Sequence, residues 1–271
     1  MSGLLAVPGI PAANAVVILT PVVSGVFNNG NGVNSHWVQV QNTWRGPSAF
    51  SQSYGGISSI ADANAALGLT SADPGFMRSA DAVMGTVNAG NDVYNTQWGA
   101  TWGTANMPPL FNTGDLHQEN YAGHVTGYIA VTQPGDYNFG VMADDGFSFA
   151  IQGANGSESM SLDGMNPRDR YGFGPAETSR SGNAVYKSCN CDLALQQGLY
   201  RFDLVGYNRQ LAGVLNLGWW LGPNTSNFET IPQQNLYTAA PSVPVPLPGA
   251  LWLMVSGLVG LGTIRTRRRR G

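Results

Sequence analysis

The fold class can be read most directly from residues 124–151, HVTGYIAVTQPGDYNFGVMADDGFSFAI. Polar and apolar residues alternate over 124–132, which is typical of a strand with one face in a core. The sequence Gln-Pro-Gly-Asp at 133–136 then predicts a tight turn. Two more short apolar stretches follow at 137–143 and 147–151, with Asp-Asp-Gly between them. This succession of short strands and turns predicts a β-sandwich or β-barrel.

Similar patterns lie on both sides of this stretch. We predict further strands at 36–44 (HWVQVQNTW), 198–205 (GLYRFDLV) and 214–221 (VLNLGWWL), the last two separated by a loop at 206–213. Other segments are predicted to be helical or irregular: a short helix with an N-capping Ser at 58–67, a helical turn at 79–86, and loops at 99–118 and 153–183.

The composition agrees with such a fold. The 271 residues include 36 Gly and 16 Pro, 43% are apolar and 11% are charged. Gly, Pro and aromatic residues suit short strands joined by turns better than long helices, and the apolar fraction is large enough to fill a core. The sequence therefore predicts an all-β protein with minor short helices, forming one domain over residues 16–238.

The charge distribution argues against nucleic acid as a partner. Five arginines lie in the last seven residues, 265–271, and all 16 acidic residues precede them. Without these arginines the net charge changes from −3 to −8, so the body of the chain is acidic. An acidic surface repels a phosphate backbone but is compatible with binding cations.

The C-terminal region has three parts. Residues 247–264, LPGALWLMVSGLVGLGTI, carry no charge and are long enough to cross a bilayer as a helix, and the basic residues 265–271 favour the cytoplasmic side. A Pro-rich segment at 239–246 precedes them, so that VPVPLP runs over 243–248. This order closely resembles the PEP-CTERM sorting signal of Gram-negative bacteria in its VPLP variant. The resemblance implies export, transient membrane anchoring, cleavage by an exosortase-type enzyme, and display at the cell surface or in the extracellular biofilm matrix.

The N-terminus is expected to be a truncated signal peptide over residues 1–15. The segment 4–15 is apolar and ends in Ala-Asn-Ala, an A-x-A pattern that signal peptidase accepts, although no Lys or Arg precedes it. The alternative is that residues 16–23 form an ordinary first strand and that Ala-Asn-Ala is coincidental. The export implied by the C-terminal signal favours the signal peptide.

A second resemblance covers residues 124–238. Gly127-Tyr128, Pro134–Phe139 (PGDYNF) and Asp144–Phe147 (DDGF) look like the core of a PA14 domain, and Gly198–Tyr200 (GLY), Leu215–Trp219 (LNLGW), Ile231-Pro232 and Leu236-Tyr237 are similar to its closing strands. The resemblance implies a PA14-like β-sandwich or barrel. It also implies a role in carbohydrate binding or adhesion, since most PA14 domains have such roles.

Asp144 and Asp145 are the leading candidate site residues. Two adjacent carboxylates at a strand end repel each other unless a cation or several donors lie between them, and Ca²⁺ prefers six to eight oxygen ligands. The alternative is that Asp144 caps the turn through backbone hydrogen bonds and that Asp145 is solvated. In the adhesin and lectin members of the PA14 family the matching pair chelates Ca²⁺, which binds sugar hydroxyls. There Asn208 falls on a further ligand, and Ala212 lies where the yeast pattern has Trp.

Other candidates are less specific. Trp220 at the end of a predicted strand could stack on a sugar face, with its neighbour Trp219 in the core. Cys189 and Cys191 could form a strained disulfide or be two unrelated small residues. A polar cluster could be a second oxygen-rich site or a solvated turn: Asp163, Asn166, Arg168 and Asp169. The three histidines, His36, His117 and His124, show no metal-type spacing, and no catalytic motif stands near them.

These observations lead to one expectation and one alternative. We expect an exported, non-enzymatic protein that binds carbohydrate or exopolysaccharide through Ca²⁺, with the ion held by Asp144, Asp145 and Asn208 and with Trp220 as a further sugar contact. The alternative is a structural matrix protein whose PA14-like domain binds no sugar and whose Asp-Asp-Gly only shapes a turn.

Overall fold

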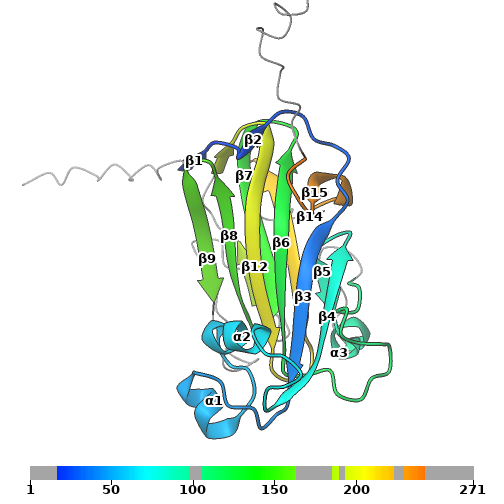
Figure 1. Ribbon diagram of the computed structural model, residues 1–271. Helices are drawn as coiled ribbons and strands as arrows, with labels where there is room; N and C mark the ends of the chain where they lie inside the picture. The colour runs from blue at the N-terminus through cyan, green and yellow to red at the C-terminus, as the bar shows by residue number, and fades with distance from the viewer. Residues whose placement is uncertain (1–16, 98–104, 163–184, 189–192, 223–228, 242–271) are drawn as a thin grey trace, which may run out of the picture. The chain divides into compact units, whose positions relative to one another are not determined.

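The computed structural model describes residues 17–97, 105–162, 185–188, 193–222 and 229–241 (Figure 1). The chain divides into two units, residues 1–240 and 241–271. The expected signal peptide, the VPVPLP motif at 243–248, the expected membrane segment and the basic tail lie outside the described residues, as do both cysteines and the polar cluster at 163–169. No helix in the described part of the chain is long and apolar enough to cross a membrane.

One of two sheets contains seven of the described strands. They are β1 (Val17–Leu19), β5 (Asn88–Gly90), β7 (Gly135–Asp144), β10 (Val185–Ser188), β11 (Leu193–Leu195), β13 (Val214–Leu221) and β14 (Glu229–Thr230). Their order is β1-β11-β7-β13-β14, with β10 also paired to β7 and β5 also paired to β13. Long strand β7 therefore lies at the centre of this sheet, antiparallel to β13.

The second sheet contains eight strands. They are β2 (Val23–Ser24), β3 (Val33–Val40), β4 (Phe76–Met84), β6 (Tyr121–Val131), β8 (Gly146–Gly153), β9 (Gly156–Leu162), β12 (Gly198–Asn208) and β15 (Leu236–Tyr237). Their order is β4-β3-β6-β12-β8-β9, with β15 also paired to β6 and β2 also paired to β12. Since β7 belongs to the first sheet and β8 to the second, the Asp-Asp-Gly segment is where the chain passes from one sheet to the other.

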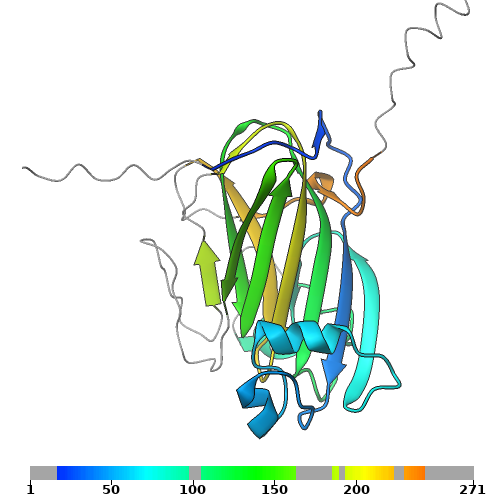
Figure 2. The same ribbon diagram turned by 60° about the vertical axis from the view of Figure 1, so that its left-hand side comes forward.

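The two sheets pack face to face as a β-sandwich (Figures 1 and 2). Aromatic rings meet across the core, since the ring of Phe139 on β7 lies 5.7 Å from that of Phe149 on β8 in the other sheet. Within the eight-stranded sheet, the ring of Phe149 lies 6.5 Å from that of Phe202 on β12. All three side chains are buried. Apolar residues at alternate positions of the strands thus produce one inner layer, as the alternation in the sequence predicts.

Short helices lie outside the sheets. They are α1 (Ala49–Tyr54), α2 (Ile60–Leu67), α3 (Asp92–Gln97) and the 3₁₀ turn η1 (Gln233–Asn235). Helix α2 begins at the N-cap Ser59, whose hydroxyl accepts a hydrogen bond from the Asp62 amide, and it packs its alanines on the outer face of the eight-stranded sheet. Figure 2 shows α2 lying across the strands at one end, with α1 beyond it.

The predicted β-sandwich with few short helices is confirmed. The strands predicted at 124–132, 137–143, 147–151 and 214–221 correspond to β6, β7, β8 and β13, and the helix predicted at 58–67 is α2. The strand predicted at 36–44 is found as β3 but ends at Val40, and β12 runs to Asn208, three residues beyond the predicted end at Val205. The extension of β12 matters because it carries Asn208 into the sheet.

Two predictions were wrong. Residues 79–86 are not helical, because most of this segment belongs to the edge strand β4, whose residues alternate in exposure. The alternation was hidden in the sequence because exposed positions carry Met77 and Val83. The expected loop at 153–183 contains strand β9, which is a polar edge strand (GSESMSL) and so has no apolar periodicity to reveal it.

Candidate cation-binding site

Strand pairing places Asp144 and Asp145 at the end of the sandwich that also carries α1 and α2 (Figure 1). Asp144 ends β7 opposite Val214, the first residue of β13, and Gly146 begins β8 opposite Tyr207 on β12. The peptide bond between the two aspartates is cis. Both side chains are almost completely enclosed, with 2% of Asp144 and 4% of Asp145 exposed. The alternative in which Asp145 is solvated therefore does not hold.

Asp145 is attached to the end of β12. Its amide donates a 2.6 Å hydrogen bond to the carbonyl of Tyr207, and its Oδ2 accepts one of 2.6 Å from the amide of Arg209. Between these two residues lies Asn208, which is fully buried. The structure thus brings the Asp pair and the predicted ligand Asn208 to the same end of neighbouring strands.

Two oxygens at this place have no hydrogen-bond partner. Asp144 Oδ1 and Asn208 Oδ1 are both buried, and neither accepts a hydrogen bond from any described residue. An unpaired buried polar atom costs about 1–3 kcal/mol because it has lost its hydration without replacement. The backbone capping that the alternative assigns to Asp144 therefore leaves at least one carboxylate oxygen unsatisfied.

Burial also shifts the acid–base equilibrium of the pair. Desolvation, and then the neighbouring charge of Asp145, raise the pKa of Asp144 well above its usual value. Desolvation raises the pKa of Asp145 to about 6, against the opposing effect of the Arg209 amide hydrogen bond and guanidinium charge. Two carboxylates with raised pKa values in one enclosure indicate that the folded protein holds negative charge there only at a cost.

Tyr121, the first residue of β6, lies beside the site. Its side chain is buried, and desolvation followed by the charges of Asp144 and Asp145 raises the pKa of its phenol. A methyl group added at Gly213 would lie 2.1 Å from the Tyr121 hydroxyl and 2.8 Å from Asn208 Cγ. Tyr121, Asn208 and Gly213 are therefore in close contact, and only glycine fits at 213.

The loop after β12 is held by the side chain of Asn91. Its Nδ2 donates to the carbonyls of Leu211 at 2.7 Å and of Gln118 at 3.1 Å, and its Oδ1 accepts from the amide of Gly213 at 3.1 Å. Asn208 Nδ2 points at the same two carbonyls over longer distances, 3.4 Å to Gln118 and 3.5 Å to Leu211. Since the amide nitrogen of Asn208 faces these carbonyls, its Oδ1 is left as the unpaired end.

This set of atoms fits a hard cation. Within the described residues no three His, Cys, Asp or Glu side chains converge on one point, so a site here depends on the amide oxygen of Asn208 in addition to the two carboxylates. Ca²⁺ accepts carboxylate, amide and backbone oxygens in flexible geometry. Asp144, Asp145 and Asn208 supply oxygens of the first two kinds, two of which lack any other partner.

A cationic and aromatic group lies beside the site and was not predicted. The guanidinium of Arg209 stacks on the ring of Phe50 at 4.5 Å, and that ring lies 4.8 Å from the ring of Tyr54, both on α1. Tyr54 is 70% exposed. Helix α1 is fixed through Asp62, whose buried carboxylate accepts hydrogen bonds from the amide and the hydroxyl of Ser48 at 2.8 and 2.6 Å. No sequence pattern connects residues so far apart.

Trp220 does not join this site. It lies six residues along β13 from Val214, which is about 20 Å at roughly 3.3 Å per residue, and it faces Asn138 near the opposite end of β7. The neighbouring Trp219 is buried against Tyr137, and Trp220 is half-buried. A stacking role for Trp220 at the same sugar as the Asp pair is therefore excluded by its position.

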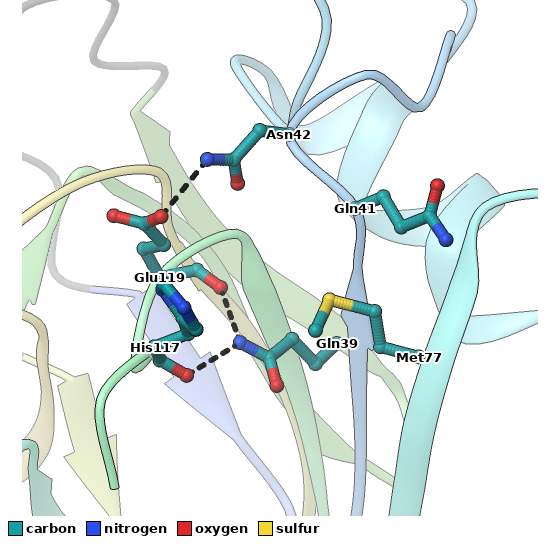
Figure 3. Close-up of a pocket in the computed structure, with 6 residues that line it drawn as sticks. All are labelled: Gln39, Gln41, Asn42, Met77, His117 and Glu119. Carbon is teal, nitrogen blue, oxygen red and sulfur yellow. Dashed lines mark hydrogen bonds between the residues drawn. The ribbon is translucent and has the colours of Figure 1, made fainter.

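A pocket of about 190 Å³ lies on the far side of segment 117–120 (Figure 3). On the pocket side, the side-chain Nε2 of Gln39 donates hydrogen bonds to the backbone carbonyls of His117, at 2.9 Å, and Glu119, at 2.8 Å. From the other side, Asn208 and Asn91 donate to Gln118. The backbone carbonyls of alternate residues in segment 117–120 thus accept hydrogen bonds from opposite sides, and the carbonyl of Gln118 helps to hold the side chain of Asn208 in place.

Comparisons with known proteins report similarity in overall fold. No protein-family model matches the chain, and no curated protein is similar to it. The chain resembles several solved structures that are distant from it in sequence.

The PA14 domain of the antifreeze protein MpAFP is 15% identical, with 79% of this chain and 94% of that chain covered at a TM-score of 0.44. The A domain of epithelial adhesin 6 from Candida glabrata, in complex with Galβ1-3GlcNAc, is 14% identical, with 83% and 95% covered at 0.45. An anti-sigma factor domain-containing protein from Clostridium clariflavum is 17% identical at 0.42, and the match spans 80% of this chain and 50% of that protein.

Proposed function

We propose that this chain is a carbohydrate-binding or adhesion protein that binds sugar through a calcium ion held by Asp144, Asp145 and Asn208. The observation that carries the proposal is the pair of buried oxygens without partners, Asp144 Oδ1 and Asn208 Oδ1, next to two carboxylates with raised pKa values. A divalent cation would satisfy the oxygens and neutralise the charge in one step.

The chain's own groups have distinct tasks in this proposal. Asp144 and Asp145 supply the charge. Asn208 supplies a neutral oxygen, which is oriented because its Nδ2 donates to the carbonyl of Gln118 in segment 117–120. Buried Tyr121 lies near both carboxylates, whose charges raise the pKa of its phenol. A bound Ca²⁺ supplies open coordination positions for sugar hydroxyls. The ring of Tyr54 is exposed and packs against Phe50, on which Arg209 stacks beside the site. It offers a face on which a sugar ring can stack.

Calorimetry with Ca²⁺ on the purified protein tests the proposal directly. We expect heat of binding for the wild type and none for Asp145→Ala, with Asp136→Asn as the matched control because Asp136 is an exposed carboxylate at the other end of the same strand. A glycan array with and without EDTA then tests sugar binding. If Ca²⁺ binds but no glycan is retained, the structural matrix protein is the better description. If no Ca²⁺ binds, the site is wrong.

Affinity at one such site should be weak, because a cation and a few hydroxyl contacts bury little surface. Useful adhesion would then come from many copies acting together, which raises the overall avidity without any new contact. Surface plasmon resonance can test this with a polysaccharide that flows over the protein immobilised at low or at high density. Dissociation of the polysaccharide should be slower from the dense surface.

We also propose that the chain is exported and anchored through residues 247–264 until an exosortase-type enzyme cleaves it near the VPVPLP motif at 243–248. The support is the three-part order of Pro-rich motif, uncharged stretch and arginines in the sequence. Mass spectrometry of the mature protein from the cell surface or medium should find no peptide from 249–271. Recovery of the intact C-terminus there would contradict the proposal.

A further inference from the structure

Two of the chain's three histidines occupy directly opposite positions of adjacent strands on the outer surface of the eight-stranded sheet. His36 on β3 is the direct antiparallel partner of His124 on β6. Side chains directly opposite in an antiparallel pair lie on the same face with Cβ atoms about 4.5–5.5 Å apart. The sequence separates the two by 87 positions, so the pairing comes from the register alone.

A carboxylate lies against each histidine. Nδ1 of His36 is 2.7 Å from Asp81 Oδ1 on β4, and Nε2 of His124 is 3.0 Å from Asp203 Oδ2 on β12. The four side chains thus come from four neighbouring strands, β4, β3, β6 and β12. Asp81 and Asp203 lie on the two outer strands of this group, β4 and β12, and His36 and His124 lie on the two inner strands, β3 and β6.

These contacts define which ring nitrogen is available. A neutral imidazole has one N–H and one lone pair, and the nitrogen facing a carboxylate carries the hydrogen. The lone pairs are therefore on His36 Nε2 and His124 Nδ1. Metal-binding histidines in proteins are commonly arranged in this way, with the second nitrogen donating to a carboxylate that fixes the ring and raises its basicity.

The pair is open to solvent. About a third of each histidine side chain is exposed, 35% for His36 and 37% for His124. Helix α2 packs on the next pair of outer-face residues along these strands, Val38 and Ala122. An ion could therefore reach the imidazoles without any rearrangement of the core. The outer carboxylates are also accessible, with 84% of Asp81 and 41% of Asp203 exposed.

We propose that His36 and His124 form a second cation site, selective for divalent transition-metal ions such as Zn²⁺, Ni²⁺ or Cu²⁺. Imidazole nitrogens prefer these ions, whereas Ca²⁺ takes oxygen ligands. No third His, Cys, Asp or Glu converges with them among the residues that the structure describes. The ion is thus held by two imidazoles and completes its coordination with water, while Asp81 and Asp203 act as positioning residues.

The test is a Zn²⁺ titration of the full chain by calorimetry in excess Ca²⁺, which occupies oxygen sites, and with Cys189 and Cys191 replaced by Ser to remove thiol ligands. We expect one Zn²⁺ per chain. His36→Ala and His124→Ala should each weaken binding by more than tenfold, and Asp81→Asn and Asp203→Asn by about tenfold, as such supporting carboxylates do elsewhere. The third histidine provides the control, because His117→Ala should bind Zn²⁺ like the parent.

A spectroscopic measurement separates direct coordination from loss of folding. Electron paramagnetic resonance of bound Cu²⁺ should show two nitrogen ligands in the parent and one in either single variant, each of which should melt within a few degrees of the parent because the side chains are on the surface. Equal Zn²⁺ affinity in His36→Ala and the parent, selective loss of binding in His117→Ala, or a single nitrogen in the parent spectrum would overturn the proposal.

Discussion

Asp144→Asn should be at least as stable as the wild type without calcium and less stable than the wild type when calcium is added. In the folded protein without a cation, burial raises the pKa of both aspartates, and the charge of Asp145 raises that of Asp144 further; the pKa of Asp145 reaches about 6. In the unfolded chain both titrate near 3.8. The folded state thus binds more protons than the unfolded state above this pH, so stability falls as pH rises.

The magnitude follows from the size of this difference. A carboxyl raised from 3.8 to about 6 costs about 3 kcal/mol of folding free energy once the pH is above both values, since one pKa unit corresponds to about 1.4 kcal/mol. Asp144→Asn removes the carboxyl whose pKa is raised both by burial and by the charge of Asp145. In EDTA at about pH 7.5 the variant should therefore be at least as stable as the wild type, whereas most substitutions of buried residues destabilise.

Calcium should act in the opposite direction. A ligand at 100 times its dissociation constant stabilises the folded state by about 2.7 kcal/mol, which corresponds to about 5–10 °C in melting temperature for a domain of this size. The wild type should gain this shift, and Asp144→Asn should gain none. Differential scanning calorimetry in EDTA and in Ca²⁺ gives all four values, with Asp136→Asn expected to follow the wild type in both.

The reasoning also predicts a pH profile for the calcium-free wild type. Its stability should fall as the pH rises from about 3.8 through about 6, the unfolded and folded pKa values of Asp145. This fall should be smaller in Asp144→Asn, which lacks one of the two shifted carboxyls. The argument would be refuted if Asp144→Asn were clearly less stable than the wild type in EDTA and if Ca²⁺ left the melting of the wild type unchanged. Asp144 would then be a structural residue whose burial the fold requires.

Three other substitutions test the surroundings of the site. Asn208→Asp adds a third buried carboxylate, so it should lower the melting temperature in EDTA and increase the shift caused by Ca²⁺ in the same calorimetric assay. Gly213→Ala places a methyl 2.1 Å from the Tyr121 hydroxyl and should lower the free energy of unfolding in urea by about 1–3 kcal/mol, whereas Gly68→Ala, with its nearest atom at 3.6 Å, should be neutral. Asp62→Asn should lose about 1–3 kcal/mol in urea because an amide nitrogen then faces hydroxyl and amide donors, while Ca²⁺ affinity by calorimetry stays unchanged.

The sequence predicted the central strands well because their physics is local. Strands β6, β7, β8 and β13 have one face in the core, so alternate residues are apolar, and Pro134-Gly135 marks the turn between β6 and β7. The edge strands were missed for the same reason. Strand β4 and strand β9 bury little, so nothing in their composition separates them from a helical turn or a loop.

The site was predictable only in part. The adjacent aspartates and Asn208 are visible as residue types in the sequence, and the structure brings both aspartates and the Asn to one end of the sandwich. Their burial, the unpaired oxygens and the role of Asn91 depend on contacts between separate segments, such as those of Asn91 with Gln118, 27 residues away, and with Gly213, 122 residues away. Trp220 was predicted as a sugar contact, but the structure places it near the opposite end of β13 from the Asp pair, which the sequence pattern alone does not show.

The energetics of the Asp pair give the most general reason to expect a ligand there. A buried charge that lacks a partner is among the most destabilising features a fold can contain, and replacing it with apolar residues commonly raises stability. This chain buries two carboxylates side by side and adds an amide oxygen that accepts no hydrogen bond from the described residues. Capping of the turn between β7 and β8 does not by itself account for this combination, because Asp144 Oδ1 and Asn208 Oδ1 are left without a partner. A bound cation does explain it, because each of the three unfavourable features becomes a ligand.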